Sequence, residues 1–333
     1  MSRATLKTLS EHTGLSITTV SRALKDGPEV KPDTIAIVKK AAKELGYRPN
    51  ASGIGLKTGK TFVIALVMPV IKPGDVLGDV GTLPLIEGIT ATLEPTPYHL
   101  TVIPQEPGEA PLNPVKHVVD HGFADGIIIT STQPNDERVK LLNDANIPFV
   151  TFGRTELATQ HPWYDVDNAD FVYQAAMRLY GQGCQRIILF VPDRDYLFAW
   201  HRISGLKRAA MEFGREVQEE DLITEGNAEN YQKFVQQAAT WDQAPDGYIC
   251  GTEITAMAVT SGLFQAGLTP NSDVKVVTLE VSPLAGFLHP PVTGYYQDLH
   301  RAGRTLSSLF VKRIEGEDVA KLQILDKVQL VER

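Results

Sequence analysis

The chain has 333 residues, of which 43% are hydrophobic and 22% are charged, and its formal net charge at pH 7 is −8. This hydrophobic content excludes a disordered chain, and the length allows one small domain beside one or two cores of ordinary size. The two cysteines, Cys184 and Cys250, form neither a CxxC motif nor a zinc-ligand spacing, so we expect reduced, buried thiols. No signal peptide is recognisable and no apolar run approaches the roughly 18 residues of a membrane span, which predicts a soluble cytoplasmic protein.

The charge is divided unevenly along the chain. Residues 1–60 hold eleven Lys or Arg against five Asp or Glu, a net charge of +6, whereas the remainder holds twenty-one against thirty-five, a net charge of −14. A basic head on an acidic body indicates a polyanion partner for one end only. Charged surface helices are the plainer interpretation, but the helical pattern of the head favours nucleic acid.

Three short helices are predicted in the first fifty residues. Thr5 caps the first helix, which ends at Gly14, because glycine tolerates the left-handed turn after a helix. Ser16 caps the second helix. Pro32 opens the third in its first turn, and Gly46 closes it. Such a segment is typical of a helix-turn-helix DNA-binding headpiece.

The second helix buries Val20, Ala23 and Leu24 at helical spacing and turns a polar set outward. Hydroxyl groups suit phosphates or base edges, an apolar side chain suits a thymine methyl group, and an arginine forks onto guanine. The outward residues are Ile17, Thr18, Thr19, Ser21 and Arg22.

Two motifs in this region are specific. Thr19 to Arg22 reads TVSR, and Glu44 to Asn50 reads ELGYRPN. With this spacing the chain resembles the lactose and galactose repressor family, and the resemblance extends more weakly through the rest of the chain. It implies a headpiece over residues 1–49. The residues of the headpiece and of the hinge after it that are expected to contact DNA are Thr5, Leu6, Ser16, Ile17, Thr18, Thr19, Ser21, Arg22, Asn50 and Leu56.

Residues 50–60 correspond to the hinge helix of that family, which folds on operator DNA. Leu56 occupies the position of the leucine that enters the minor groove, where an apolar wedge unstacks a base step and bends the duplex. Gly53 and Gly55 depart from the family pattern, and each costs about 1 kcal/mol of helix stability relative to Ala. We therefore expect a hinge that is more disordered without DNA, or one that is incompletely helical.

The same stretch offers a rival interpretation as a phosphate-binding loop. The motif GxxxxGK[ST] needs four residues between its glycines, but before Gly59 the spacing is five from Gly53 and three from Gly55. The segment also precedes the first strand, where such a loop follows one. Nucleotide hydrolysis is disfavoured on both grounds.

From residue 61 onward, apolar strands alternate with amphipathic helices. Continuous apolar runs are typical of parallel strands that are covered on both faces. The predicted strands are 62–68, 98–103, 126–130, 149–152, 187–191, 248–250 and 274–279, and the predicted helices are 85–93, 115–120, 138–144, 171–179, 202–213, 231–239 and 256–264. The predicted fold class is an all-α helix-turn-helix headpiece plus an α/β body of two doubly wound parallel-sheet lobes, similar to periplasmic binding proteins.

The resemblance implies that neither lobe is contiguous in sequence. The chain is expected to cross between lobes near Trp163, Gly294 and Leu322. The ligand-binding and dimerisation body, residues 61–333, then has lobe one at about 61–163 and 295–321, and lobe two at about 164–294 and 322–333.

Ligands bind beyond the carboxyl ends of such strands, which the two facing lobes turn into a cleft. Arg154 follows a strand at a position where the family commonly has a ligand-contacting Arg, Asp167 begins its DN pair, and Arg202 begins its R..G motif. A surface ion pair is the alternative role for each arginine, and helix capping is the alternative for Asp167.

Two family positions are altered. Thr252-Glu253 stands where many relatives carry Asn-Asp, and Glu280 replaces their ligand-binding Asp with a longer side chain. Gln297 falls at the family's crossover glutamine. Each of these three is also explicable as an ordinary polar residue at a strand end.

Further candidate ligand residues are aromatic or lie near the expected lobe junction. Aromatic rings stack on the apolar face of a sugar, whereas its hydroxyls need carboxylates, amides and guanidinium groups. Core packing is the alternative for the aromatic residues. These candidates are Glu156, His161, Trp163, Trp200 and Tyr231, and Asp165 belongs to the same polar and aromatic cluster near the junction as the first three.

We therefore expect a ligand-responsive repressor of sugar uptake or catabolism genes, without a cofactor. It would bind a near-palindromic operator as a homodimer, because each monomer reads one half-site, and a small carbohydrate in the cleft would release it. No leucine heptad follows the body, so a dimer rather than a tetramer is expected. The alternatives are a co-repressor-type regulator that senses a nucleobase or other metabolite, a carbohydrate enzyme fused to a DNA-binding head, and an architectural DNA binder. Of these, the enzyme is disfavoured because no catalytic or metal-binding motif is found.

Overall fold

The structure is a computed structural model that describes residues 4–47, 59–70, 80–224 and 226–333. It divides into two compact units, of which the first ends at Phe62 and the second begins at Val63. Each unit is described by itself below.

The N-terminal unit contains three helices, α1 (Leu6–Thr13), α2 (Ile17–Ala23) and α3 (Pro32–Glu44). Thr5 caps α1 by accepting a hydrogen bond from the backbone N–H of Thr8, and Gly14 ends it with φ of 69°. Ser16 caps α2, and Pro32 stands in the first turn of α3, so the local signals in the sequence are confirmed. The small core is made of Leu9, Val20, Ala23, Val38 and Ala41.

Lobe one of the larger unit is built on a six-stranded parallel sheet with the order β11-β5-β4-β3-β1-β2. Its strands are β1 (Val63–Pro69), β2 (His99–Gln105), β3 (Gly126–Ile129), β4 (Phe149–Phe152), β5 (Trp163–Val166) and β11 (Gln323–Asp326). Its helices are α5 (Thr82–Leu93), α6 (Leu112–His121), α7 (Glu137–Asp144) and α12 (Leu299–Ile314).

Lobe two repeats this plan with the strand order β12-β10-β9-β8-β6-β7, in which only the β10–β12 pair is antiparallel. Its strands are β6 (Ile187–Val191), β7 (Leu222–Thr224), β8 (Gly247–Cys250), β9 (Lys275–Glu280), β10 (Thr293–Tyr296) and β12 (Gln329–Val331). Its helices are α8 (Asn168–Gly181), α9 (Leu197–Glu212), α10 (Ala228–Ala238) and α11 (Glu253–Gln265), and short 3₁₀ turns span Glu219–Asp221, Pro283–Phe287 and, in lobe one, Val319–Lys321. The two expected doubly wound sheets are confirmed.

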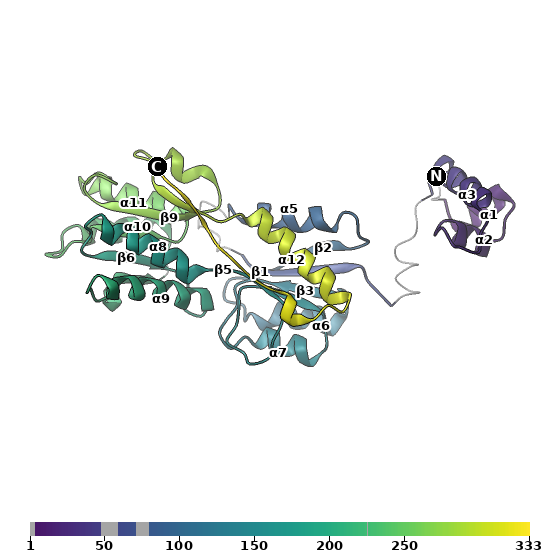
Figure 1. The fold of residues 1–333 in the computed structure, drawn as a ribbon, viewed down its shortest axis with the longest axis horizontal. Coiled ribbons are helices and arrows are strands. Elements are labelled where there is room, and N and C mark those ends of the chain that lie inside the picture. The colour runs from purple at the N-terminus through teal and green to yellow at the C-terminus, as the bar shows by residue number, and fades with distance from the viewer. Residues whose placement is uncertain (1–3, 48–58, 71–79, 225) are drawn as a thin grey trace. The chain divides into compact units, whose positions relative to one another are not determined.

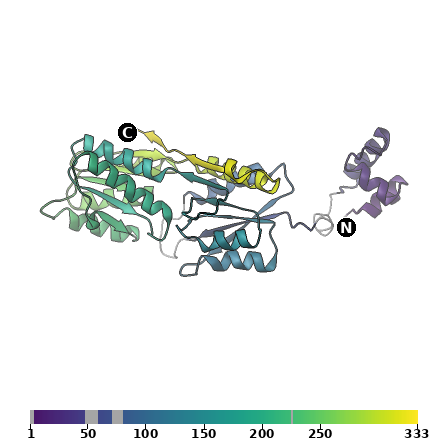
Figure 2. The same cartoon turned by 60° about the horizontal axis from the view of Figure 1, so that its bottom comes forward.

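Apolar side chains on both faces of each sheet hold the helices. In lobe one, α6 and α7 cover β1, β3 and β4 through one buried cluster, whereas α5 and α12 lie side by side (Figures 1 and 2). The α5–α12 contact depends on Gly88 and Gly303, because a Cβ at Gly88 would lie 2.1 Å from the carbonyl oxygen of His300 and one at Gly303 would lie 2.2 Å from that of Leu85. In lobe two, α8 and α9 pack on one face and α10 and α11 on the other.

The chain crosses between the lobes after β5, after β10 and after β11. These crossings follow Val166, Tyr296 and Asp326, a few residues later than the sequence indicated, because the apolar pattern does not mark where those strands end. The sequence also failed to predict α12, although Ala302, Leu306 and Leu309 on one of its faces are buried at helical spacing.

Both cysteines are buried free thiols, as expected. Among the residues described by the structure, no helix has both the length and the apolar character needed to cross a membrane.

Candidate functional site

The exposed face of α2 is the candidate DNA-reading surface. Ile17 is 49% exposed, and Thr18 and Arg22 are also exposed. Thr19 and Ser21 are partly buried, and the hydroxyl of Thr19 lies 2.8 Å from that of Ser16. The expected outward residues therefore lie on the accessible side of this helix, with the hydroxyls of Ser16 and Thr19 already engaged in capping.

The remaining candidate DNA contacts differ in their surroundings. Thr5 is exposed at the start of α1. Leu6 is partly buried and packs against the headpiece core, because it lies on the same face of α1 as Leu9. Asn50 and Leu56, together with Gly53 and Gly55 of the expected hinge, lie outside the described residues.

A cavity of about 230 Å³ lies between the two lobes, at the carboxyl ends of the strands of lobe one. This is the place at which doubly wound sheets bind ligands. It is smaller than the roughly 300–1,000 Å³ of pockets for drug-sized ligands, so it suits a small molecule. The cavity is lined by Met68, Gly81, Thr82, Leu85, Thr130, Ser131, Phe152, Gly153, Asp165, Val166, Asn168, Phe198, Arg202, Gln297 and Leu299.

Arg202 brings a cation from α9 of lobe two to this cavity. Its Nε donates to Oδ1 of Asn168 at 2.8 Å, and its guanidinium carbon lies 5.4 Å from the ring centre of Phe198. Among the described residues no acceptor makes a hydrogen bond to Nη1 or Nη2 of Arg202. Burial lowers the pKa of the guanidinium to about 10, opposed by the charge of Asp165. Because Arg202 lines the cavity, its guanidinium group can donate to a ligand there.

Asp165 is the acidic residue among those that line the cavity, and it forms an ion pair with Arg154. Nε of Arg154 donates to Oδ2 of Asp165 at 2.8 Å, and Oδ1 accepts from the backbone N–H of Val166 at 2.8 Å. Burial raises the pKa of this carboxyl, and the hydrogen bond from Arg154 opposes the rise. Nη2 of Arg154 also lies 3.4 Å from Nδ1 of His201 on α9, so it links the two lobes. Arg154 was expected to touch the ligand, but it does not line the cavity, since its guanidinium is bound to Asp165.

Asp167 and Gln297 lie at two of the crossings. Asp167 caps α8 by accepting from the backbone N–H of Asp170 at 3.0 Å, so the structure shows the capping role. Its neighbour Asn168 lines the cavity, and so does Gln297, whose backbone N–H donates to the carbonyl of Glu280.

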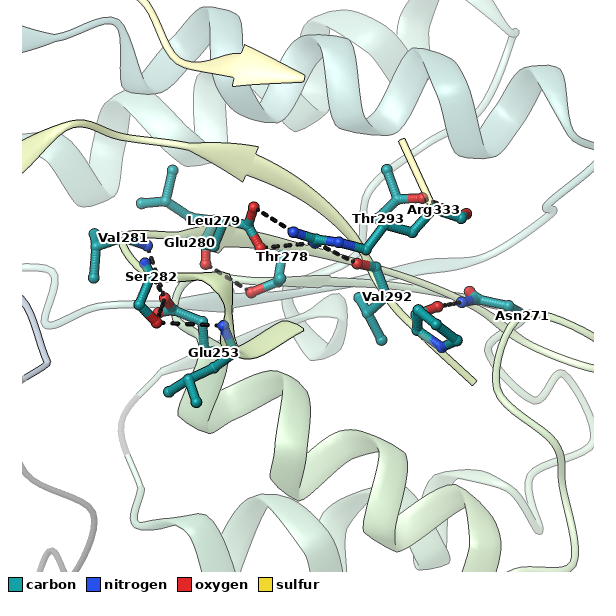
Figure 3. A network of polar contacts seen from close by, with 12 residues as sticks. Glu253, Asn271, Thr278, Leu279, Glu280, Val281, Ser282, Val292, Thr293 and Arg333 are labelled. Carbon is teal, nitrogen blue, oxygen red and sulfur yellow. Dashed lines mark hydrogen bonds and ion pairs between the residues drawn. The ribbon is translucent and has the colours of Figure 1, made fainter. Parts of the chain in front are cut away.

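Glu253 and Glu280 were expected at the ligand, and the structure uses both elsewhere (Figure 3). Oε1 of Glu253 accepts from the backbone N–H groups of Val281 and Ser282 at 2.7 and 2.8 Å. Glu280 accepts a fork from Arg333, with Nη1 at 2.8 Å and Nη2 at 2.9 Å. Neither glutamate lines the cavity. Both carboxylates instead accept hydrogen bonds from internal donors that are distant in sequence.

The five remaining candidates also lie outside the cavity lining. Glu156 is exposed, and Trp163 lies under the guanidinium of Arg154. His161 is buried against Phe149. Trp200 is 47% exposed and donates to the carbonyl of Arg194, and Tyr231 packs edge-on against Phe190.

Of the residues that line the cavity, the sequence offered Arg202 and Gln297 as ligand candidates, Asp165 as a member of the polar and aromatic cluster near the lobe junction, and Asn168 as the second member of the DN pair, but it did not single out Phe198. The signal for Asp165 was its place in that polar and aromatic cluster, between Trp163 and the DN pair. Phe198 had none, because an aromatic residue in the first turn of a helix is equally compatible with a core.

The family described as bacterial regulatory proteins, lacI family, matches residues 5–50, and the periplasmic binding protein-like domain matches residues 176–333. The HTH-type transcriptional regulator AglR of Rhizobium meliloti (strain 1021) is 30% identical over 340 residues, covering 98% of this chain and 93% of that protein.

Two solved structures have a similar fold. The transcriptional regulator CelR–cellobiose complex matches with a TM-score of 0.71 and 24% identity, covering 99% of both chains. The lac repressor dimer bound to operator and the anti-inducer ONPF matches with a TM-score of 0.82 and 19% identity, covering 100% of this chain and 98% of that one.

The headpiece and the two-lobed body define the chain as a DNA-binding transcriptional regulator rather than an enzyme. The chain belongs to the lacI family of bacterial regulatory proteins.

Proposed function

We propose that this regulator is a repressor of sugar uptake or catabolism genes that releases its operator when a small carbohydrate occupies the interlobe cavity. The observation that carries the proposal is this cavity, in which a carboxylate of lobe one faces a guanidinium of lobe two. Sugar hydroxyls both donate and accept hydrogen bonds, so the carboxylate of Asp165 can accept from them and the guanidinium group of Arg202 can donate to them. The amide of Gln297 and the ring of Phe198 complete the site.

A ligand that contacts Asp165 and Arg202 touches both lobes at once, so its binding depends on how the two lobes are arranged. A ligand that binds one arrangement of the lobes better than another shifts the equilibrium between them. The coupling needed to alter DNA affinity is modest, typically 1–3 kcal/mol. The similar CelR structure holds cellobiose, which makes that sugar a first probe.

The DNA half of the proposal assigns the headpiece to residues 1–49, the hinge to 50–60 and the body to 61–333, in a cytoplasmic homodimer. Two headpieces are needed because each reads one half-site of a near-palindromic operator. The proposed base contacts come from the exposed face of α2, including Ile17, Thr18 and Arg22. Leu56 is proposed as the wedge in the minor groove.

The test combines ligand and DNA. The full-length protein is screened by thermal shift with mono- and disaccharides, including cellobiose and maltose. A sugar at 100 times its Kd should add about 2.7 kcal/mol to the free energy of unfolding. It should also release a duplex that the protein itself has selected from a random library, measured by gel shift.

Matched variants locate the site. Arg202→Lys and Gln297→Ala should lose the thermal shift, whereas Lys207→Ala, an exposed change on the same helix α9, should keep it. A sugar that stabilises the protein without releasing the duplex would contradict the proposed release mechanism, and one that stabilises the Arg202→Lys protein equally would contradict the proposed site.

A further inference from the structure

The candidate DNA-reading surface contains an acidic residue whose position electrostatics alone does not explain. Glu29, in the segment between α2 and α3, has its Oε1 3.2 Å from Nε of Arg22, and both side chains are about half exposed. A carboxylate beside an arginine that reads DNA repels the phosphates and lowers affinity for any sequence. Its presence at this point therefore needs another explanation.

The backbone holds Glu29 in place. The carbonyl of Arg22 accepts hydrogen bonds from the N–H groups of Lys25 and Gly27, and the N–H of Val30 donates to the carbonyl of Gly27. Asp26 ties the same turn to α3 through Nζ of Lys39, at 2.6 Å.

Glycine at position 27 gives the Glu29 side chain room to fold back toward α2. A Cβ there would lie 3.0 Å from Oε2 of Glu29 and 3.2 Å from the carbonyl oxygen of Arg22. The turn thus brings Glu29 to Arg22 while keeping both side chains accessible.

The ion pair is made at the Nε edge of the guanidinium group, where Oε1 of Glu29 lies 3.2 Å from Nε. Among the described residues no acceptor makes a hydrogen bond to Nη1 or Nη2 of Arg22. Bidentate recognition of guanine O6 and N7 requires two parallel N–H groups of a fixed fork, which the two Nη groups provide. A carboxylate on the Nε edge restricts rotation of that fork and leaves its reading end open.

We propose that Glu29 is a positioning residue that orients Arg22 for guanine and thereby sets base specificity at one position of each half-site. The inference rests on the proposed function, in which Arg22 reads a base. Glu29 touches no base itself. Its charge lowers affinity for DNA of any sequence, whereas its contact with Arg22 raises discrimination at a single base pair. A variant at this position should therefore change the two quantities in opposite directions.

The experiment selects duplexes from a random-sequence library with the full-length protein and its variants, then measures Kd for the wild-type consensus site and for each single-base change. Arg22→Ala identifies the position that Arg22 reads, where the wild type should discriminate by roughly 5-fold to 150-fold. Glu29→Gln should lower discrimination at that same position by about twofold to fivefold. Its affinity for a non-cognate duplex should be equal to or above that of the wild type.

Glu44→Gln is the matched control, because Glu44 is also a half-exposed headpiece carboxylate but pairs with His12 and Lys40. It should leave the selected motif unchanged. The double variant Arg22→Ala, Glu29→Gln should discriminate at that position no worse than Arg22→Ala alone. Glu29→Asp, which keeps the charge but has a shorter reach, should lose discrimination without the gain in non-cognate affinity.

The outcomes separate the inference from the proposed function. If the wild type enriches a motif and Arg22→Ala flattens one position of it but Glu29→Gln does not, the positioning role is wrong. A uniform loss at all positions, together with a lower melting temperature of the headpiece, would show a purely structural role and overturn the inference. A wild-type protein that enriches no motif would refute the proposed operator binding itself.

Discussion

Removal of the Arg333 side chain tests how much the buried ion pair between Arg333 and Glu280 stabilises the body. Arg333 forks onto Glu280 with two hydrogen bonds, and its Nη1 also donates to the carbonyl of Val292 at 2.9 Å (Figure 3). The carboxylate side chain is 2% exposed and the guanidinium side chain 16% exposed. Arg333→Ala therefore leaves an almost completely buried carboxylate without its cation.

Breaking a buried ion pair from one side costs 3–5 kcal/mol, because the remaining charge is uncompensated. Arg333 is slightly exposed and water can partly replace it, so we expect about 3 kcal/mol for Arg333→Ala. With an m-value of about 3 kcal/mol/M, the urea midpoint should fall by about 1 M. Adding Glu280→Gln to Arg333→Ala should recover part of this loss, because the orphaned charge is then absent.

Arg178→Ala is the matched control. Arg178 pairs with Glu332, the neighbour of Arg333 in the chain, at 2.8 Å, but that glutamate side chain is 67% exposed. Exposed pairs contribute about 0.2–1 kcal/mol, so the midpoint should move little. Equal effects of the two alanine variants in urea unfolding followed by fluorescence would refute the reasoning from burial, and so would a recovery of nothing in the double variant.

Three further predictions concern packing, pH and the cavity. Gly88→Ala should destabilise the protein by about 1–3 kcal/mol in thermal unfolding because α12 has no room for a Cβ, whereas Gly181→Ala, in open space at the end of α8, should be neutral or stabilising. Burial lowers the pKa of His161, so the unfolded chain binds a proton there at a higher pH than the folded protein does. The free energy of unfolding should therefore be at its full value above about pH 6.5 and fall as the pH drops below it. His161→Gln should flatten this slope in urea titrations between pH 7 and 5, and an unchanged slope would contradict the prediction. Arg154→Ala removes the donor to Asp165 and should weaken binding of the sugar identified by thermal shift about 10-fold to 100-fold; unchanged affinity by calorimetry would show that the pair does not position the carboxylate.

Local chemistry made the headpiece predictable. The hydroxyls of Thr5 and Ser16, the left-handed Gly14 and the first-turn Pro32 act within a few residues of their own position, so their roles follow from sequence order alone. The strands of the body were predicted for a related reason, since a run buried on both faces of a sheet is apolar throughout.

The composition of the cavity was less predictable. Arg202 and Gln297 were placed there because the resemblance marked them, but Glu280 and Arg154 carry equally suitable groups and bind elsewhere. Whether a carboxylate or guanidinium group is available to a ligand depends on whether the fold places an internal hydrogen-bonding partner beside it. The partner of Glu280 lies 53 positions along the chain, in the C-terminal segment that the sequence assigned to lobe two without predicting a strand there.

By itself, the sequence determined the division into a basic head and an acidic body, the three helices of the head and the alternating strands of the body, because charge, capping and burial patterns are local properties. Only the tertiary structure decided that Asp165 rather than Glu280 faces the cavity, that Arg154 supports a carboxylate, and that Glu29 lies against Arg22. Each of those facts is a pairing of groups that the chain brings together by turning or crossing between elements, and no periodicity records it.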